Sequence, residues 1–312
     1  MKTKPDPSPR MKKTERPPRR RDPVDGVLLL DKPQGISSNA ALQRARNALG
    51  AAKAGHTGTL DPMATGLLPL AFGESTKFSQ ALLDADKGYE ATVKLGVTTT
   101  TGDAEGEVLE CKDAVFSADE IRTAAMAFIG EMAQLPPMFS ALKHAGKPLY
   151  AYAREGVDIE RKRRLIVIHS LDCEPLAPDA FVMRVRCSKG TYIRTLAEDI
   201  GARLGCGAHL TALRRTSIGA FVIENAVPLA VVEGEDIESA RAMLKPIDCL
   251  IGELPCLPLD EAQASQLCHG QTVALKHCAA GAYRVYQSAR FLGLGEVDEG
   301  GVLSSRRLVV TA

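Results

Sequence analysis

A single carboxylate stands in a run of small and apolar residues between His56 and Pro69. The run is His-Thr-Gly-Thr-Leu-Asp-Pro-Met-Ala-Thr-Gly-Leu-Leu-Pro, and Asp61 is its only acid. Pro62 disfavours the helical conformation for the residue before it, so Asp61 is expected in an extended or turn conformation. Any fold of this chain must therefore accommodate one carboxylate on a turn beside apolar side chains.

Two interpretations of Asp61 are open at this point. A lone carboxylate displayed in this way can serve an enzyme as a nucleophile or a base. Alternatively, Asp61 caps a helix that begins at Pro62, because Asp at the N-cap and Pro at the first helical position are both favoured. These residues alone do not decide between the two.

The composition is that of an ordinary globular protein, with 45% hydrophobic and 25% charged residues in a chain of 312. This length suffices for one large domain and a small one. The net charge is only +1, but residues 1–22 hold nine Lys/Arg against three acids, and residues 143–164 hold seven against three. Clustered positive charge is typical of phosphate contact, although a charged run is often only a solvated face.

Several classes of protein are disfavoured. The eight cysteines show no C-x-x-C or zinc-type spacing, so neither a metal site nor a disulfide framework is predicted. No apolar run approaches the roughly 18 residues of a membrane span. A secretory signal has an apolar segment after its basic residues, and the basic N-terminus of this chain is not followed by one. We therefore expect a cytoplasmic protein.

Helix and strand signals follow one another without regular β-α-β alternation. Residues 1–23, rich in Lys, Arg and Pro, are expected to form a disordered basic tail, with folded structure beginning near Val24. The expected strands are Gly26–Leu30, Tyr89–Leu95, Leu165–Cys173 and Phe181–Cys187. The expected helices are 37–49, 74–83, 117–129, a short one after Pro148, Thr191–Leu204 and Ile237–Leu244. This pattern predicts an α+β fold in which helices flank a mixed, largely antiparallel sheet.

The pattern changes after Pro255. A helix near Glu261–Leu267 precedes short strands separated by Gly-rich turns. These strands are expected at Thr272–Leu275, Tyr283–Tyr286, Phe291–Glu296 and Leu308–Thr311. The sequence therefore predicts a main domain over residues 24–251 and a small β-rich domain over residues 255–312.

Four motifs resemble, in order, those of the TruB family of bacterial tRNA pseudouridine synthases. They are Gly26–Gly35 (GVLLLDKPQG), the Asp61 segment, Lys87–Tyr89 (KGY) and Ser188–Leu196 (SKGTYIRTL). The similarity extends from about residue 26 to about residue 251. It continues weakly to the C-terminus, whose pattern resembles a PUA-type RNA-binding domain. The resemblance implies the pseudouridine synthase fold and an enzyme that isomerises the uridine at position 55, in the T loop of tRNA, to pseudouridine.

The resemblance also implies catalytic roles. Asp61 matches the essential aspartate, Arg194 the arginine that pairs with it, and Tyr89 a tyrosine that stacks on the base and can move a proton from C5. The isomerisation involves no redox change, energy input or metal, and a carboxylate can attack either C6 of the ring or the sugar carbon. Burial would raise the pKa of such a carboxylate, and a nearby guanidinium would offset that effect while leaving one face of the carboxylate reactive.

Further residues match positions that bind or support. Tyr192 and Leu213 match residues lining the uracil pocket, and His56 matches a histidine that fills the T loop where the target base was stacked. Lys32 and Pro33 are expected to support the loop structurally. From residue type alone, core packing remains open for Leu213 and a loop hydrogen bond for His56.

The expected partner is the T-arm stem-loop of tRNA, contacted by an insertion over residues 135–164 that contains the second basic cluster. No metal, small-molecule cofactor or membrane is expected, and a monomer is the default. A non-catalytic tRNA-binding or tRNA-folding protein is the main alternative, and a base-excising hydrolase is another. The presence of Asp61, Tyr89 and Arg194 together disfavours the first, and the lack of a second acid near Asp61 disfavours the second.

Overall fold

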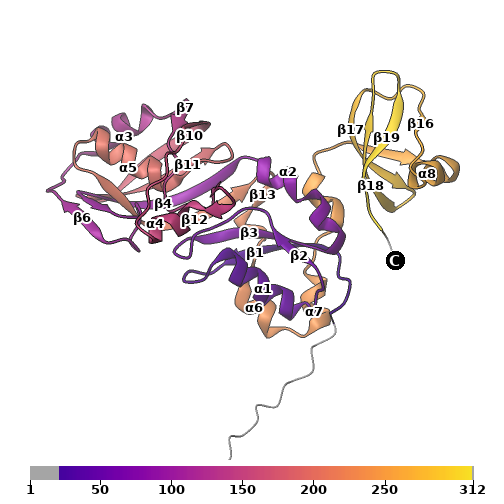
Figure 1. The fold of residues 1–312 in the computed structure, drawn as a ribbon, viewed down its shortest axis with the longest axis horizontal. Helices are drawn as coiled ribbons and strands as arrows, with labels where there is room; N and C mark the ends of the chain where they lie inside the picture. The colour runs from indigo at the N-terminus through magenta and orange to yellow at the C-terminus, as the bar shows by residue number, and fades with distance from the viewer. Residues whose placement is uncertain (1–20, 311–312) are drawn as a thin grey trace, which may run out of the picture.

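The computed structural model describes residues 21–310, which form two separate sheets with helices around them (Figure 1). The larger sheet has ten strands, in the order β14-β1-β3-β12-β4-β11-β10-β7, with β2 beside β3 and β13 beside β12. Their bounds are β1 Gly26–Lys32, β2 Ala54–His56, β3 Thr65–Phe72, β4 Lys87–Leu95, β7 Gly130–Gln134, β10 Arg164–Ala177, β11 Ala180–Cys187, β12 Ala208–Ile218, β13 Phe221–Val222 and β14 Val227–Pro228.

This sheet is mixed. The β1–β14 and β3–β12 pairs are parallel, and the other pairs in it are antiparallel. The prediction of an α+β fold with a largely antiparallel sheet is therefore confirmed. Two short hairpins lie outside it: β5 (Val97–Thr99) with β6 (Val108–Cys111), and β8 (Lys143–His144) with β9 (Lys147–Pro148).

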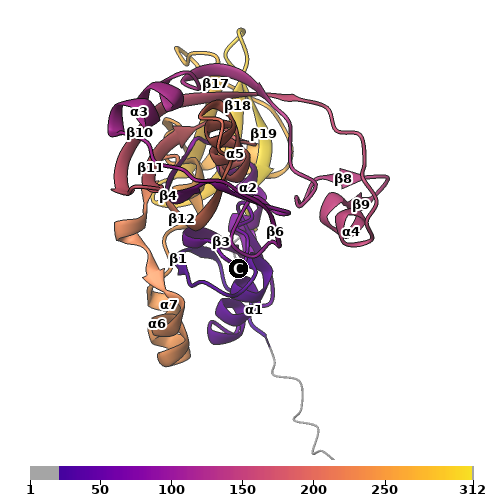
Figure 2. The same cartoon turned by 90° about the vertical axis from the view of Figure 1, so that its left-hand side faces the viewer.

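The described residues before the C-terminal sheet form seven α-helices, of which all but α4 lie near the large sheet (Figure 2). They are α1 Ser38–Ala48, α2 Ser79–Asp84, α3 Ala118–Met126, α4 Leu149–Arg154, α5 Ile193–Arg203, α6 Leu229–Gly234 and α7 Ile237–Ala242. Three short 3-10 helices occur at Gly73–Phe78, Ile223–Asn225 and Ile247–Ile251. Helices α3 and α5 lie along one end of the sheet, and α1, α6 and α7 lie beside β1 at the other (Figure 1). The expected caps are present: Ser37 accepts from the Ala40 amide, and Ser117 forms a capping box with Glu120.

The insertion predicted over residues 135–164 contains β8, β9 and α4. In Figure 2 this part of the chain stands away from the main sheet. Its hairpin is closed by a turn at Ala145 and Gly146, both with positive φ. Helix α4 begins directly after Pro148, as the sequence predicted, and ends at Arg154.

The small C-terminal sheet has the order β15-β17-β18-β19-β16 and is covered by α8 (Glu261–Cys268). Its strands are β15 Cys256–Leu259, β16 Val273–Ala274, β17 Gly281–Gln287, β18 Arg290–Val297 and β19 Val302–Leu308. Phe291 on β18 packs edge-on against Phe78 of the main domain, with ring centroids 5.6 Å apart. Lys77 also donates to the Leu308 carbonyl, so the two parts share an apolar and polar interface.

Several expected boundaries are wrong. The last strand runs over Val302–Leu308, whereas it was expected over Leu308–Thr311. The polar residues at 304–307 interrupt the apolar pattern by which a strand is recognised, so the strand was predicted too late in the chain. The helix expected over Thr191–Leu204 spans Ile193–Arg203, and the helix expected to reach Ile129 ends at Met126.

Folded contacts also begin earlier than expected. The Asp22 amide donates to the Gly50 carbonyl (2.9 Å), and the Asp22 carbonyl accepts from the Ala52 amide (2.8 Å). The main domain therefore starts two residues before Val24. The expected disordered tail, apart from its last three residues, lies outside the described part of the chain.

The sequence did not predict β12, which lies in the middle of the sheet between β3 and β4. It reads Ala-His-Leu-Thr-Ala-Leu-Arg-Arg-Thr-Ser-Ile, and two of its polar side chains, His209 and Arg215, are buried. Polar residues at core-facing positions hide the alternation by which a strand is recognised. The hidden strand is the one that places Leu213 and Arg215 beside Tyr89 of β4.

Candidate active site

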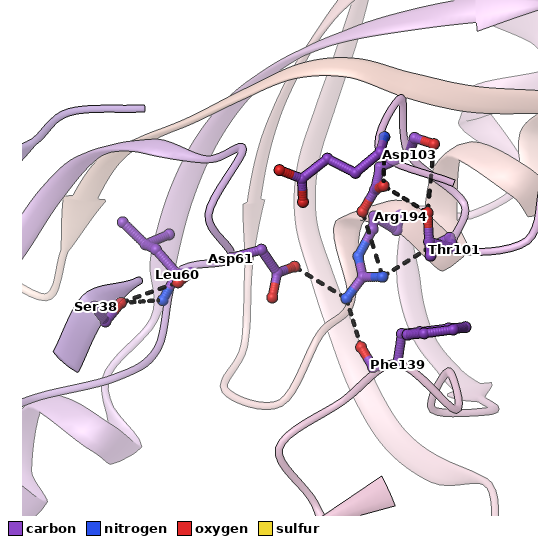
Figure 3. A network of polar contacts seen from close by, with 8 residues as sticks. Ser38, Leu60, Asp61, Thr101, Asp103, Phe139 and Arg194 are labelled. Carbon is purple, nitrogen blue, oxygen red and sulfur yellow. Dashed lines mark hydrogen bonds and ion pairs between the residues drawn. The ribbon is translucent and has the colours of Figure 1, made fainter. Parts of the chain in front are cut away.

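Asp61 lies on a loop over residues 57–64 that joins β2 to β3. The Ser38 hydroxyl of α1 holds this loop at the preceding residue, donating to the Leu60 carbonyl (3.0 Å) and accepting from the Leu60 amide (2.7 Å; Figure 3). No helix begins at Pro62; the Ala64 amide closes a tight turn onto the Asp61 carbonyl at 3.1 Å. The helix-cap interpretation of Asp61 is therefore wrong.

Lys32 holds the same loop from beneath. Its side chain is fully buried, and its ammonium donates to the carbonyls of Pro33 (2.9 Å), Ala64 (2.7 Å) and Pro62 (3.5 Å). Burial lowers the pKa of Lys32 to about 8, and the nearby Asp61 carboxylate partly opposes this shift. The contacts agree with a structural role for Lys32 and for the backbone of Pro33.

Arg194, on the first turn of α5, lies opposite Asp61. One terminal nitrogen, Nη2, is 2.9 Å from Asp61 Oδ2 and also donates to the Phe139 carbonyl at 2.7 Å. The other, Nη1, donates to the Thr101 carbonyl at 2.7 Å and lies 3.5 Å from Asp103 Oδ2. Figure 3 shows the guanidinium at the centre of these contacts. The acceptors come from three loops, so the arginine is fixed from several sides.

The two members of the ion pair differ in exposure. The Arg194 side chain is 6% exposed, whereas the Asp61 side chain is 39% exposed. A buried guanidinium thus holds a carboxylate that remains open on its other side. A reactive aspartate needs this arrangement, in which a guanidinium favours the charged carboxylate and one face of the carboxylate stays accessible.

Asp103 was not singled out in the sequence, although it sits in the polar turn after β5. Its side chain is 4% exposed and accepts from the Thr101 hydroxyl (2.6 Å) and the Glu105 amide (3.1 Å). A buried acid in a Gly-rich turn has no distinctive spacing, so only the fold reveals that it faces Arg194. It provides Arg194 with a second carboxylate besides Asp61.

The predicted residues converge on one cavity of about 400 Å³. Asp61, Tyr89, Tyr192, Arg194 and Leu213 all line it. A larger cavity of about 710 Å³ lies where the C-terminal sheet meets the main domain, and none of the predicted site residues borders it. Size alone would therefore have misplaced the site, and the chemistry of the lining residues locates it.

Tyr192 is held through its backbone. The side chain of Gln134, at the end of β7, accepts from the Tyr192 amide (2.8 Å) and donates to the Tyr192 carbonyl (3.0 Å). Gln134 is 2% exposed and was not predicted. Because Tyr192 is the N-cap of α5, this clamp also fixes the start of the helix that presents Arg194. Burial raises the pKa of Tyr192, which favours the neutral phenol.

Tyr89 lies on β4 directly opposite Arg215 on β12. Burial raises the pKa of Tyr89, and the Arg215 guanidinium acts against that shift. Leu213 is 8% exposed and belongs to the apolar core while also lining the cavity, so both interpretations of this residue hold.

His56 lies outside the cavity, as do Lys32 and Pro33. It is the last residue of β2. Burial and the nearby Arg215 lower its pKa, so the imidazole is neutral at physiological pH. A neutral ring suits the expected stacking role better than a titrating one.

Within the described residues, no three His, Cys, Asp or Glu side chains lie close enough together to hold a metal ion. All eight cysteines are free, and Cys173, Cys187 and Cys206 are buried. Between residues 21 and 310 there is no helix with the length and apolar character needed to cross a bilayer.

Comparison with known proteins gives consistent matches along the chain. Residues 46–193 match the N-terminal domain of the TruB family of pseudouridylate synthases, residues 194–251 match the C-terminal domain of tRNA pseudouridylate synthase B, and residues 255–309 match the C-terminal domain of pseudouridine synthase II TruB. The tRNA pseudouridine synthase B of Aromatoleum aromaticum is 58% identical over 92% of this chain and 94% of its own. That of Burkholderia mallei is 53% identical over 95% of this chain and 97% of its own.

Solved structures share the fold. A Cbf5–Nop10–Gar1 complex contains a chain with a TM-score of 0.67 and 27% identity, covering 89% of this chain and 80% of that one. An H/ACA ribonucleoprotein bound to a substrate RNA containing 2′-deoxyuridine gives a TM-score of 0.68 at 24% identity, covering 92% and 85%, and supports the fold alone.

Fold and site together are those of a pseudouridine synthase. More particularly, this chain belongs to the TruB family of these enzymes, as its four motifs predicted. The alternative of a non-catalytic RNA-binding protein finds no support among these relatives.

Proposed function

We propose that this enzyme converts the uridine at position 55, in the T loop of tRNA, to pseudouridine, with Asp61 as the nucleophile acting on an extruded nucleotide. One observation carries the proposal: a partly exposed carboxylate is paired with a buried arginine on the wall of a cavity of about 400 Å³. The relatives' name, tRNA pseudouridine synthase B, supports tRNA as the substrate.

In this proposal, Arg194 fixes Asp61 Oδ2 and leaves Oδ1 free to attack. The attack falls on C6 of the ring or on the sugar carbon, and either route loosens the bond between N1 and the ribose. The base then turns, and C5 joins the same sugar carbon. Tyr89, Tyr192 and Leu213 supply the flat and apolar surfaces that hold a base outside its stack. The proton that C5 must lose passes to Tyr89.

Binding of the T arm uses the insertion over residues 135–164. It contains the seven positive residues of the second basic cluster, and its Phe139 carbonyl contacts Arg194 directly. The C-terminal domain, as a PUA-like module, also binds RNA. His56 fills the space in the T loop that the target base leaves when it is extruded. Phosphate contacts of this kind make affinity fall steeply with salt. The enzyme acts as a monomer in the cytoplasm. Because the isomerisation involves no redox change or energy input, its chemistry requires no metal or organic cofactor.

Mapping of pseudouridine in a tRNA transcript tests the proposal. We expect a single site at position 55 after incubation with the enzyme, and the same product in an isolated T-arm stem-loop. A transcript with cytidine at position 55 and an anticodon stem-loop serve as matched controls without the target. Product at another position, or none in the T-arm substrate, would contradict the assignment.

A further inference from the structure

Arg215 is a buried cation without an acidic partner. It is 1% exposed, its Nε donates to the Leu67 carbonyl at 2.7 Å, and its Nη2 has no hydrogen-bond partner. No acid in residues 21–310 forms an ion pair with it. The preceding residue, Arg214, points to the other face of the strand and pairs with Asp31 at 2.7 Å. Burying an uncompensated charge is costly, so an anion that forms only during the reaction is a reasonable counterpart.

Tyr89 is the residue that the geometry offers. It is the direct partner of Arg215 in the antiparallel register of β4 and β12, so the two side chains share a face of the sheet. Both also line the cavity that contains Asp61. Leu213, two residues before Arg215, shares that face, and thus the strand places the guanidinium behind the phenol and the leucine beside it.

We propose that Arg215 is a positioning residue for Tyr89, holding the phenol oxygen for the C5 proton and stabilising the phenolate that accepts it. The inference rests on the proposed function and deepens it. Once C5 has bonded to the sugar carbon, it still carries its hydrogen. That proton moves to the phenolate oxygen, and the electron pair of the C–H bond restores the double bond between C5 and C6. At the same time C6 gives up a bonding pair: it leaves with the Asp61 oxygen if Asp61 attacked C6, or it moves from the C6=N1 bond to N1 if Asp61 attacked the sugar carbon. N1 takes a proton from water, and the phenol later returns its own proton to water.

The charges around the phenol favour this role for Arg215. Burial raises the pKa of Tyr89, and Cys187 on β11 and Asp61 on the catalytic loop raise it further, while Arg215 lowers it. Lys87, on the same strand as Tyr89, donates to the Leu82, Leu83 and Ala85 carbonyls at the end of α2. Arg215 is therefore the cation aimed at the phenol oxygen from the neighbouring strand.

Single-turnover kinetics with a T-arm stem-loop, carrying hydrogen or deuterium at C5 of the target uridine, test the proposal. We expect Arg215→Gln to slow pseudouridine formation roughly 10- to 100-fold, to increase the isotope effect, and to shift the pH profile of the rate to higher pH. Arg215→Lys should restore part of the rate. Arg214→Gln, on the opposite face, is the matched control and should leave the isotope effect unchanged.

A double-mutant cycle separates action through Tyr89 from a general structural role. In the Tyr89→Phe background, Arg215→Gln should slow the reaction by less than about threefold more. An equal loss in both backgrounds, with an unchanged isotope effect and pH profile, would overturn the proposal.

Titration of the tyrosines gives a readout that requires no turnover. The chain has six Tyr and no Trp, so tyrosinate absorbance is free of indole signal, and subtraction of the Tyr89→Phe curve isolates Tyr89. We expect Tyr89 to ionise at higher pH in Arg215→Lys and Arg215→Gln than in the wild type. The shift should be larger in the Gln variant, which has no charge at this position, and an unshifted titration in the folded Gln variant would refute the proposal. This result does not depend on whether the T loop is the substrate, so the two failures are distinguishable.

Discussion

The Arg194 guanidinium lies 2.9 Å from the Asp61 carboxylate, and the exposed fractions of the two side chains are 6% and 39%. An ion pair between two exposed side chains contributes little, because water screens it and both side chains lose entropy. Here one partner is already fixed by the Thr101 and Phe139 carbonyls and by Asp103. Orienting the aspartate therefore costs little additional conformational entropy, and its second oxygen stays available to substrate.

Replacement of Arg194 by lysine should slow chemistry more than it weakens binding. The Arg194 contacts are divided between two nitrogens, with Nη2 on Asp61 and the Phe139 carbonyl and Nη1 on the Thr101 carbonyl. A lysine has a single nitrogen and does not reproduce this planar, two-nitrogen arrangement. We expect single-turnover rates roughly 100-fold lower, with tRNA affinity changed less than about threefold. Arg203→Lys, at the exposed end of the same helix, is the matched control. A loss confined to affinity would show that Arg194 only binds RNA.

Lys32 should give the protein a pH-dependent stability. Its pKa is about 8 in the folded protein and returns to 10.5 on unfolding. Between these values the unfolded chain binds more protons, so the free energy of unfolding rises with pH, by at most about 1.4 kcal/mol per pH unit. Lys32→Met removes this contribution, whereas Lys87, whose pKa is also about 8, remains in both proteins.

Denaturant unfolding at several pH values measures the effect. The wild type should gain stability relative to Lys32→Met as pH rises from about 8 to about 10.5. A difference between the two proteins that stays constant over this range would show that the Lys32 ammonium is not destabilised by burial.

The basic part of the insertion should contact phosphates. Within the described residues, the ammonium groups of Lys143 and Lys162 form no ion pair or hydrogen bond. Their joint replacement by alanine should weaken tRNA binding uniformly and reduce the slope of log affinity against log salt by about 2. Lys94→Ala, at the far end of β4 and already paired with Asp179, provides the control. An unchanged salt slope in the double variant would remove these lysines from the RNA interface.

The order of the main helices and strands could be predicted because capping residues, glycines and hydrophobic alternation in the sequence match the positions that these residues take in the folded chain. Ser117 and Glu120 form the capping box that their spacing predicts, and Gly50 and Gly205 end helices in a left-handed conformation. The strands over Tyr89–Leu95 and Phe181–Cys187 alternate in burial, as strands with one face on the core do. Pro62 also predicted that Asp61 lies on a turn and not within a helix, and the structure places Asp61 outside any helix.

The rest of the site depends on contacts between distant segments. Asp103, Gln134 and Arg215 come from three different elements, and each is a buried polar residue whose partner lies 58 or more residues away, or on the adjacent strand. The hydrophobic periodicity of a sequence does not indicate which distant residue a buried polar side chain will contact. Arg215 alone had a usable signal, since it follows the predicted pocket residue Leu213 by two positions on what proved to be a strand.

The central claim is that the Asp61 carboxylate performs the chemistry. Asp61→Asn keeps the shape of the side chain and can still accept from Arg194, but it removes the anionic oxygen. In a single-turnover assay with a T-arm stem-loop, chemical mapping should detect no pseudouridine with this variant, while its tRNA affinity stays within about threefold of the wild type. Formation of pseudouridine at the wild-type rate would contradict the account.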